Sequence, residues 1–338
     1  MTSYHPVFQQ VFEKIQKSQR VLLLSHRNPD GDTLGANLAL RRYILSLGKE
    51  VVSFSVDKPR ETYWFLPNID SLQTDREVLS IEKFDLVIVL DCDLRYTGVI
   101  DEIKSFSYPF VLVNIDHHFT NDQDGEVNLV VSDASSTTTV LYYFFLDQHI
   151  PIDKTMALYL LTGIIYDTDG FNNPATNKHS LEASARLLLQ GVRISPIVQV
   201  LLRNKSFTTM KLWGRALSRL KKDEKTGLAT TVIRQEDFVE FGASEDATEG
   251  ISNFLNSLGG VKAVLILKDY RDGYVKGSFR TTNDLVDVSE FAKIYGGGGH
   301  KKAAGFMIKA NIAETEEAWK VIPHDPQAVE QLARLGYF

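Results

Sequence analysis

Histidine and aspartate side chains gather at four places in the first half of this 338-residue chain. The first is the stretch SHRNPDGDTLG, residues 25–35, which directly follows an apolar run at residues 21–24. A turn here explains the asparagine, the proline, the glycine and one aspartate, but not a histidine and a second aspartate. Acids and histidines also follow three later apolar segments. The candidate residues are His26, Asp30, Asp32, Asp91, Asp93, Asp116, His117, His118, Asp167 and Asp169.

Carboxylates and imidazoles in combination are suitable ligands for divalent ions such as Mn²⁺. The single cysteine, Cys92, argues against a structural zinc site, which needs several thiolates. Several carboxylates at one place repel one another, which raises their pKa values unless cations neutralise them. Two ions about 3.5–4 Å apart meet that need, and such pairs recur in enzymes that hydrolyse phosphate esters. A turn or a helix cap is the alternative interpretation for any one of these acids taken alone.

The segments around these clusters predict the scaffold that positions them. Four apolar, β-rich segments predict buried strands, and helical patterns lie between and after them. The strand segments are residues 21–26, 51–56, 84–93 and 110–118, and helices are expected at residues 137–150, 153–168 and 177–191. This alternation predicts an α/β domain built on a parallel sheet. Because sites in such sheets form at the carboxyl ends of the strands, the clusters are expected to meet there.

The second half of the chain has a different pattern. Residues 194–226 show helical periodicity with a lysine-rich end, which predicts a helical linker between a domain at 1–193 and another at 227–338. In the second domain, the stretch KDYRDGYVKG predicts a hairpin, since Asp-Gly favours a tight turn between strands. Further strands and helices around it predict a smaller α+β domain.

Composition limits the classes of protein and partner that fit. The net charge of −6 argues against a protein that follows long duplex DNA, which usually needs a basic face. The first 20 residues predict an amphipathic helix rather than a signal peptide. No run of 18 apolar residues occurs, so we expect neither a membrane span nor a membrane partner. The lone cysteine fits a reducing compartment, and a cytoplasmic location is expected.

Taken in order, the clusters resemble the four motifs of the DHH phosphoesterases. The matching stretches are H-x-N-P-D-G-D at 26–32, V-L-D ending at 91, D-H-H at 116–118 and Y-D-T-D-G-F at 166–171. A later stretch, Y-G-G-G-G-H-K-K-A-A-G-F at 295–306, resembles the glycine-rich motif of the DHH-associated C-terminal domain. The resemblance covers nearly the whole chain. It implies a parallel-sheet DHH domain joined by a helical connector to a smaller α+β domain.

The resemblance also implies a set of metal ligands. Two Mn²⁺ ions are expected, with Mg²⁺ as a substitute, and Asp91 would bridge them. The other ligands would be His26 and Asp30 at one ion, and Asp32, His117 and Asp167 at the other.

Four further residues near the ligands receive different roles. The resemblance implies that Asp116 orients an imidazole, as ligand histidines usually require. His118 would face the substrate phosphate as an electrostatic stabiliser or proton donor. Asp93 and Asp169 are interpreted as structural residues or as supports for the ligands.

The glycine run at residues 296–299 has a physical interpretation of its own. Its backbone N–H groups can turn inward to form an anion-binding nest, and a histidine and two lysines follow with positive charge. A flexible loop is the alternative. A strand-end arginine that matches the family's substrate contact could bind a phosphate through two hydrogen bonds. The expected substrate-binding residues are Arg280, Gly297, Gly298, Gly299 and His300.

The chain departs from the family pattern in two places. Asn172 and Asn173 stand where related small proteins often carry an arginine, and Thr139 stands where an acid is common. Neither change removes a predicted ligand. Both lie near the expected substrate site, so they bear on substrate preference.

The function that the resemblance favours is manganese-dependent hydrolysis of short single-stranded RNA, such as dinucleotides, and of 3′-phosphoadenosine 5′-phosphate. A water activated by the two metals would be the nucleophile. The main alternative is a phosphodiesterase for cyclic or linear signalling dinucleotides. An inorganic pyrophosphatase, a long-strand exonuclease and a nonenzymatic nucleotide sensor fit less well. The oligomeric state stays open, and a homodimer is compatible with the sequence.

Overall fold

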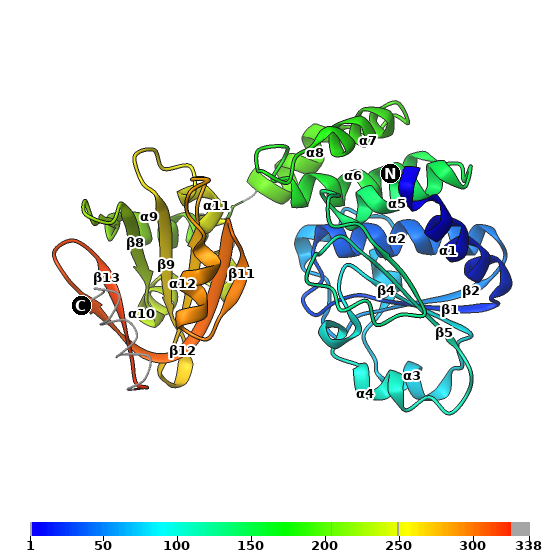
Figure 1. Ribbon diagram of the computed structural model, residues 1–338, viewed down its shortest axis with the longest axis horizontal. Coiled ribbons are helices and arrows are strands. Elements are labelled where there is room, and N and C mark those ends of the chain that lie inside the picture. Colours follow the sequence, from blue (N-terminus) through cyan, green and yellow to red (C-terminus); the bar gives the residue numbers. More distant parts are fainter. Residues whose placement is uncertain (1, 204, 249, 326–338) are drawn as a thin grey trace. The chain divides into compact units, whose positions relative to one another are not determined.

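The computed structural model describes residues 2–203, 205–248 and 250–325. The chain folds into two compact units, Met1–Asn204 and Lys205–Phe338 (Figure 1). Among the described residues, no helix is both long enough and apolar enough to cross a membrane.

A six-stranded sheet forms the centre of the first unit, in the order β3-β2-β1-β4-β5-β6. Every neighbouring pair in it is parallel, which confirms the predicted parallel sheet. The strands are β1 Arg20–Leu24, β2 Glu50–Phe54, β3 Leu72–Gln73, β4 Leu86–Leu90, β5 Val111–Asp116 and β6 Val127–Val130. β1, β2, β4 and β5 correspond to the four apolar segments, whereas the short edge strands β3 and β6 were not predicted.

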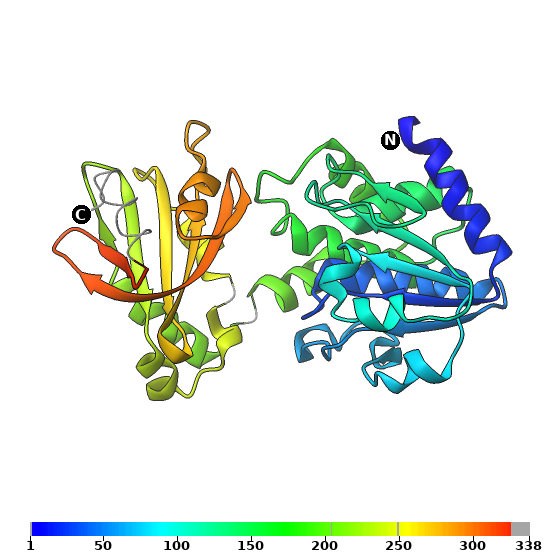
Figure 2. The ribbon, with the colours of Figure 1, turned by 60° about the horizontal axis from the view of Figure 1, so that its bottom comes forward.

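Helices cover both faces of this sheet. Val21 and Leu23 of β1 pack into one core cluster with the larger helices, and Leu22 and Leu24 pack into another. This alternation explains why β1 and β4 are apolar at nearly every position. On the first face lie α1 His5–Lys17, α2 Gly31–Ser46, α5 Thr137–Asp147, α6 Lys154–Asp167 and α7 Lys178–Leu188, and on the second lie α3 Glu77–Ile81 and α4 Ile100–Lys104 (Figure 2). Short 3₁₀ turns occur at Thr2–Tyr4, Glu61–Tyr63, Ile69–Ser71 and Leu94–Thr97.

The segment at residues 194–226 is divided between the two units. It begins with α8 Ile194–Val198 and a π-helical turn at Gln199–Arg203. Ile197 and Leu201 from these elements pack into the core of the first unit. The next helix, α9 Phe207–Ser218, packs in the second unit.

The second unit is built on a mixed sheet in the order β11-β12-β10-β9-β8-β7, with β13 paired to β12. Among the strands described in this unit, only β8 and β9 pair in parallel. The predicted hairpin is confirmed, because β9 and β10 are antiparallel and Asp272 between them adopts a φ of 61°. The strands are β7 Lys221–Lys222, β8 Leu228–Ile233, β9 Ala263–Asp269, β10 Tyr274–Arg280, β11 Gly298–His300, β12 Ala303–Glu314 and β13 Trp319–Pro323.

Helices cover both faces of the second sheet as well. One face packs against α12 Val288–Ile294, and the other packs against α9, α10 Gln235–Phe241 and α11 Ile251–Leu255. Short 3₁₀ turns lie at Glu245–Thr248 and Arg271–Gly273. The expected α+β character of this domain is therefore confirmed.

Candidate metal centre

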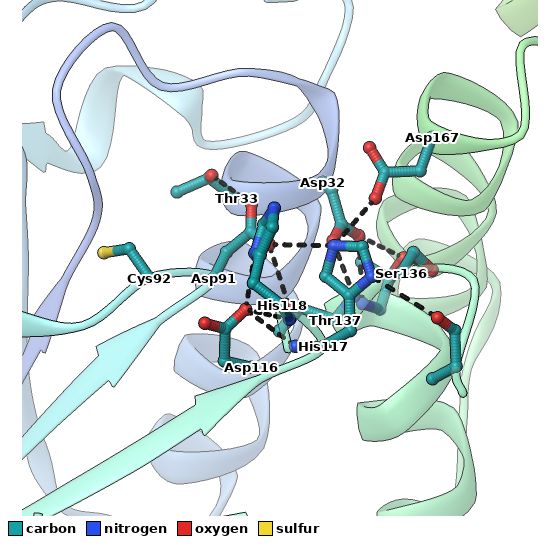
Figure 3. Close-up of polar contacts among 12 residues, drawn as sticks. Asp32, Thr33, Asp91, Cys92, Asp116, His117, His118, Ser136, Thr137 and Asp167 are labelled. Carbon is teal, nitrogen blue, oxygen red and sulfur yellow. Dashed lines mark hydrogen bonds and ion pairs between the residues drawn. The ribbon is translucent and has the colours of Figure 1, made fainter. Parts of the chain in front are cut away.

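Asp91 lies at the centre of the first unit's polar cluster, directly after β4. Its backbone adopts a φ of 65°, and its side chain is only 3% exposed. Asp91 Oδ2 accepts a hydrogen bond from the Thr33 hydroxyl at 2.6 Å, and Oδ1 accepts one from the Thr137 hydroxyl at 2.9 Å (Figure 3). Because these threonines begin α2 and α5, two helix starts fix the orientation of this carboxylate.

His26 and Asp30 lie on one side of Asp91. His26 Nε2 is 3.5 Å from Asp91 Oδ2 and 3.8 Å from Asp30 Oδ2. Asp30 is the N-cap of α2, and its Oδ1 accepts hydrogen bonds from the amides of Asp32 and Thr33. The cap therefore occupies one oxygen of Asp30 and leaves the other directed toward His26.

His117 and Asp167 lie on the other side of Asp91. His117 Nε2 is 3.6 Å from Asp91 Oδ1 and 3.2 Å from Asp167 Oδ2. Asp167 is the last residue of α6, so this helix delivers its carboxylate to the cluster from a distant part of the sequence.

Asp32 is fully buried beside the start of α5. Its Oδ2 accepts a hydrogen bond from the Thr137 amide at 2.6 Å, and its Oδ1 accepts bonds from the Thr138 amide at 2.9 Å and hydroxyl at 2.5 Å. The partial positive charge at a helix N-terminus favours a carboxylate in this position. Asp32 thus anchors α2 to α5 while it faces His117 and Asp167.

Asp116, the last residue of β5, holds His118. Its Oδ1 accepts hydrogen bonds from the amides of His117 and His118, and it lies 2.8 Å from His118 Nδ1. Its Oδ2 accepts a bond from the Asn121 side chain at 2.6 Å. The imidazole that Asp116 orients is therefore His118, whose side chain is 42% exposed.

These side chains form three overlapping groups that could each hold a metal ion. Within each group, one ligand atom per residue lies within 4.8 Å of all the others. Asp91 and His117 each belong to two groups, which is the sharing that a pair of ions needs. The groups are His26, Asp30 and Asp91; Asp32, His117 and Asp167; and Asp91, Asp116, His117 and His118. The donor set, carboxylate oxygens with imidazole nitrogens, fits divalent ions such as Mn²⁺.

Proton equilibria in the cluster reflect its crowded charges. Burial, together with the charges of Asp91 and Asp167, raises the pKa of Asp32. Burial also raises the pKa of Asp167 to about 6, against the opposing effect of His117. Burial lowers the pKa of His26, but its contacts with Asp30 and Asp91 outweigh this and raise it to about 11. Protonated imidazoles thus offset the negative charge of the carboxylates. A bound cation would offset the same charge in place of these protons.

Asp93 and Asp169 lie outside all three groups. Asp93 accepts a hydrogen bond from the Arg95 amide and forms an ion pair of 2.9 Å with its side chain, so it has a structural partner. Asp169 follows α6 with a φ of 50°.

The two departures from the family pattern have definite places. Thr139 is fully buried, and its hydroxyl lies 2.8 Å from those of both Ser135 and Ser136. Asn173 donates a hydrogen bond of 2.7 Å from its side chain to the backbone oxygen of Asp167. Asn173 therefore supports the end of α6 that carries a candidate ligand.

A pocket of about 540 Å³ opens onto the cluster. Its lining includes His26, Asp30, Asp91, Asp116, His118 and Asp167, together with Arg27, Arg95, Tyr96 and Asn121. The residues that support the ligands, such as Thr33, Thr137 and Asn121, were not predicted from the sequence. Thr33 stands within the first motif, but nothing in the sequence indicated that its hydroxyl would bind Asp91.

The predicted substrate-binding residues lie in the second unit. Arg280 ends β10, β11 consists of Gly298, Gly299 and His300, and Gly297 directly precedes β11. Arg280 on β10 is opposite Ala303 on β12, which in turn is opposite His300 on β11. Residues directly opposite each other share a face of a sheet, so Arg280 and His300 face the same side, two strand spacings of about 4.8 Å apart. Arg280 donates a hydrogen bond to the Phe279 oxygen, and no described carboxylate of this unit forms an ion pair with it.

The hypothesis of an anion nest made by all four glycines is wrong for Gly296 and Gly297. Their amides donate to the backbone oxygens of Lys293 and Ala292, so they close the end of α12. Gly298 and Gly299 belong to strand β11 rather than to a loop. Gly299 adopts a φ of 142°, and a Cβ there would lie 2.6 Å from the Ala303 oxygen, so the edge strand itself requires this glycine.

Gly163 in α6 tests how tightly the site is packed. A Cβ at this position would overlap Asp32 Oδ1 and Thr138 Oγ1. We expect Gly163→Ala to lower the free energy of unfolding by roughly 1–3 kcal/mol, the usual cost of overpacking, and to weaken metal binding because Asp32 must move. Chemical denaturation and metal titration measure the two effects.

Gly214 in α9 is the matched control, because a Cβ there would meet nothing within 4 Å. Gly214→Ala should raise stability by about 0.5–1 kcal/mol, since alanine favours a helix. Equal stability changes for the two variants would contradict the tight packing around Asp32.

Comparison with known proteins identifies the family. Residues 20–164 match the DHH family, N-terminal domain, and residues 224–323 match the DHHA1 domain. A bifunctional oligoribonuclease and PAP phosphatase, NrnA, from Thermus thermophilus is 30% identical over 94% of this chain and 91% of its own length.

Two further similarities extend this comparison. The cyclic-di-AMP phosphodiesterase GdpP from Geobacillus thermodenitrificans is 27% identical over 93% of this chain, which spans about half (48%) of that relative. An exopolyphosphatase-related protein from Bacteroides fragilis has the same fold, with a TM-score of 0.83 over 98% of each chain at 20% identity. The resemblance found in the sequence is thus confirmed, and the chain belongs to the DHH family of phosphoesterases, hydrolases that act on phosphoester bonds.

Proposed function

We propose that the protein hydrolyses short RNA oligonucleotides and 3′-phosphoadenosine 5′-phosphate in a manganese-dependent reaction. The observation that carries this proposal is the position of Asp91 at the carboxyl end of β4, in one ligand group with His26 and Asp30 and 3.6 Å from His117 of another. The similarity to NrnA over nearly the full length of both chains supports the choice of substrate. No membrane-spanning helix occurs among the described residues, and we propose that the protein acts in the cytoplasm.

The proposed ligands follow the geometry of the groups. Asp91 would bridge two Mn²⁺ ions, for which Mg²⁺ could substitute. When bound, two such ions lower the pKa of a water and neutralise the phosphoryl oxygens. The residues proposed to hold them are the group His26, Asp30 and Asp91 at one site, and the group Asp32, His117 and Asp167 at the other. Asp91 is proposed to join the second site as well, because its Oδ1 lies 3.6 Å from His117 Nε2.

His118 is the proposed catalytic side chain, and Asp116 is the residue that positions it. Burial lowers the pKa of His118, but the hydrogen bond to Asp116 outweighs this effect, so the pKa lies above its usual value. A protonated His118 that lines the pocket can stabilise a phosphoryl oxygen or donate a proton to the leaving oxygen. Asp116 keeps Nδ1 occupied, which leaves Nε2 for this task.

Arg280, Gly298, Gly299 and His300 are the proposed substrate contacts in the second unit. The shared face of Arg280 and His300 supports this role, as does the absence of an ion-pair partner for Arg280 among the unit's described residues. Gly297 would contribute through its lack of a side chain rather than through its amide, which is already bonded to Ala292.

We expect Arg280→Ala to raise KM for a dinucleotide by roughly 10- to 100-fold, because the substitution removes one or more charge-assisted hydrogen bonds. Metal binding should not change, because Arg280 lies outside the unit that carries the ligand groups. Steady-state kinetics and a metal titration test this prediction. An exposed arginine on the other unit, Arg186, is the matched control. An unchanged KM would contradict a substrate role for Arg280.

The alternative function is hydrolysis of cyclic or linear signalling dinucleotides. The similarity to GdpP favours it, although this chain spans only about half of that relative. The same ligand groups would serve both reactions, so the substrate panel has to separate them.

A single panel of substrates tests the proposed function. End-labelled RNAs of two to about 24 nucleotides, 3′-phosphoadenosine 5′-phosphate, cyclic di-AMP and pyrophosphate are compared at fixed salt with Mn²⁺. We expect the rate to fall as the RNA grows, because a chain with a net charge of −6 gains little from phosphates outside the site. Equal or rising rates with length would contradict the proposal, and a clear preference for cyclic di-AMP would favour the alternative. Sedimentation of the same preparation measures whether the chain forms a homodimer.

A further inference from the structure

The pocket beside the metal centre contains two arginines whose surroundings differ. Arg95 is neutralised, because its guanidinium lies 2.9 Å from Asp93 Oδ2 and 2.7 Å from Asp122 Oδ2. Arg27 lines the same pocket and is exposed. Within the described part of the chain, no carboxylate lies within 4 Å of its guanidinium, although several aspartates line the pocket. Arg27 is therefore an unbalanced positive charge next to the candidate metal ligand His26.

Local contacts place Arg27 against the segment that follows β4. Its amide donates a hydrogen bond of 3.1 Å to the Tyr96 oxygen, which ties it to the segment after β4. Its guanidinium packs over Gly98, which has a φ of 76° and lacks a side chain. A Cβ at residue 98 would overlap Arg27 Nε. The glycine thus provides the space in which this side chain lies.

The size and lining of the pocket indicate what Arg27 could bind. At about 540 Å³, the pocket is in the usual range for small-molecule sites and exceeds the needs of one phosphoryl group. Tyr96 also lines it, with 61% of the residue exposed and the Arg95 guanidinium carbon 5.7 Å from its ring centroid. A pocket lined by both an exposed aromatic ring and the unpaired guanidinium of Arg27 suits a nucleotide, since bases stack on such rings and guanidinium groups bind phosphates.

We propose that Arg27 binds a second phosphate of the substrate, one that is not hydrolysed. This inference rests on the proposed function and narrows its substrate class to nucleotides with two phosphates. Such substrates are a dinucleotide with a terminal phosphate or a nucleoside bisphosphate. The scissile phosphate belongs at the ligand groups, and Arg27 lines the pocket that opens onto them. The planar guanidinium can then donate two parallel hydrogen bonds to the other phosphate.

Three diadenosine substrates test this assignment: ApA, which has only the scissile phosphate, and its 5′-phosphorylated and 3′-phosphorylated forms. The quantity measured is the ratio of kcat/KM for each phosphorylated form to that for ApA. We expect the wild-type protein to prefer one phosphorylated form by roughly 10- to 100-fold, as for a charge-assisted contact, and Arg27→Ala to reduce that ratio to near one. Arg27→Lys should retain part of the preference, because it keeps the charge but not the two parallel bonds.

Arg95→Ala is the matched control in the same pocket, because its charge is already balanced by two aspartates, and it should keep the wild-type ratio. If the wild-type protein showed no preference for a phosphorylated form, or if the preference survived in Arg27→Ala, the assignment of Arg27 would be overturned while the proposed function would stand. An equal loss on all three substrates would also overturn it, since Arg27 would then act on the scissile phosphate or on the fold. If the wild-type protein hydrolysed none of the three, the proposed function would fail together with this inference.

Discussion

Replacing Asp91 by asparagine is expected to abolish hydrolysis. Asp91 belongs to two of the ligand groups and lies between His26 on one side and His117 on the other. Hydrogen bonds from two threonine hydroxyls fix both of its carboxylate oxygens. Substitutions that only disturb the orientation of a ligand typically cost 10- to 100-fold, so loss of a shared ligand should lower kcat by roughly 10³-fold or more. Steady-state rates and the number of bound Mn²⁺ ions are the measurements.

Asp93→Asn is the matched control for this substitution. Asp93 is equally buried and only two residues away, but it pairs with Arg95 and belongs to none of the ligand groups. The control should keep both ions and most of the activity. Full activity with two bound ions in Asp91→Asn would refute the shared site.

Replacing His118 by alanine is expected to lower kcat by roughly 10²- to 10⁴-fold, the usual contribution of a positioned acid or base. Metal content should stay at two ions, because Asp116 already holds Nδ1 of His118 and the other groups supply enough ligands. Asp116→Asn should cause a smaller loss, since it disturbs the orientation of His118 but leaves the imidazole in place.

His179→Ala is the control for the loss of an imidazole from this unit. His179 lies on α7, with Nδ1 3.2 Å from the Tyr143 hydroxyl, and it belongs to none of the ligand groups. Its removal should leave kcat within about twofold, as for a substitution away from the reacting atoms. A His118→Ala protein that binds only one ion would contradict the catalytic role and make His118 a ligand.

The parallel sheet could be predicted because its central strands are buried on both faces. β1 and β4 are apolar at nearly every position, so the sequence shows them as continuous runs. The edge strands β3 and β6 have two and four residues, too few to give a pattern. The division of residues 194–226 between the units was equally hidden, because helical periodicity does not reveal which core a helix joins.

The ligand clusters could be predicted because each follows a recognisable apolar segment. The contacts that connect the clusters could not be predicted, because they join residues that are far apart in the sequence. Asp32 binds the amides of Thr137 and Thr138, more than 100 positions later, and the threonines that hold Asp91 come from two different helices. Local sequence carries no signal for such contacts.

The glycine run is obvious in the sequence, but its structure could not be predicted from it. Four successive glycines are compatible with a nest, a loop or a closely packed strand, and the sequence alone does not separate these. In the structure, Gly297 packs against Gly305 and Phe306, and its amide closes α12. Packing and helix capping explain these glycines as well as ligand binding does.

The most direct test of the central claim is a Mn²⁺ titration of the chelator-treated protein, with bound metal and hydrolysis of a diadenosine substrate followed together. The two proposed sites on either side of Asp91 predict two bound ions per chain, with activity that returns as the second ion binds. Undiminished hydrolysis in the presence of chelator, or full activity with a single ion, would contradict the two-metal centre.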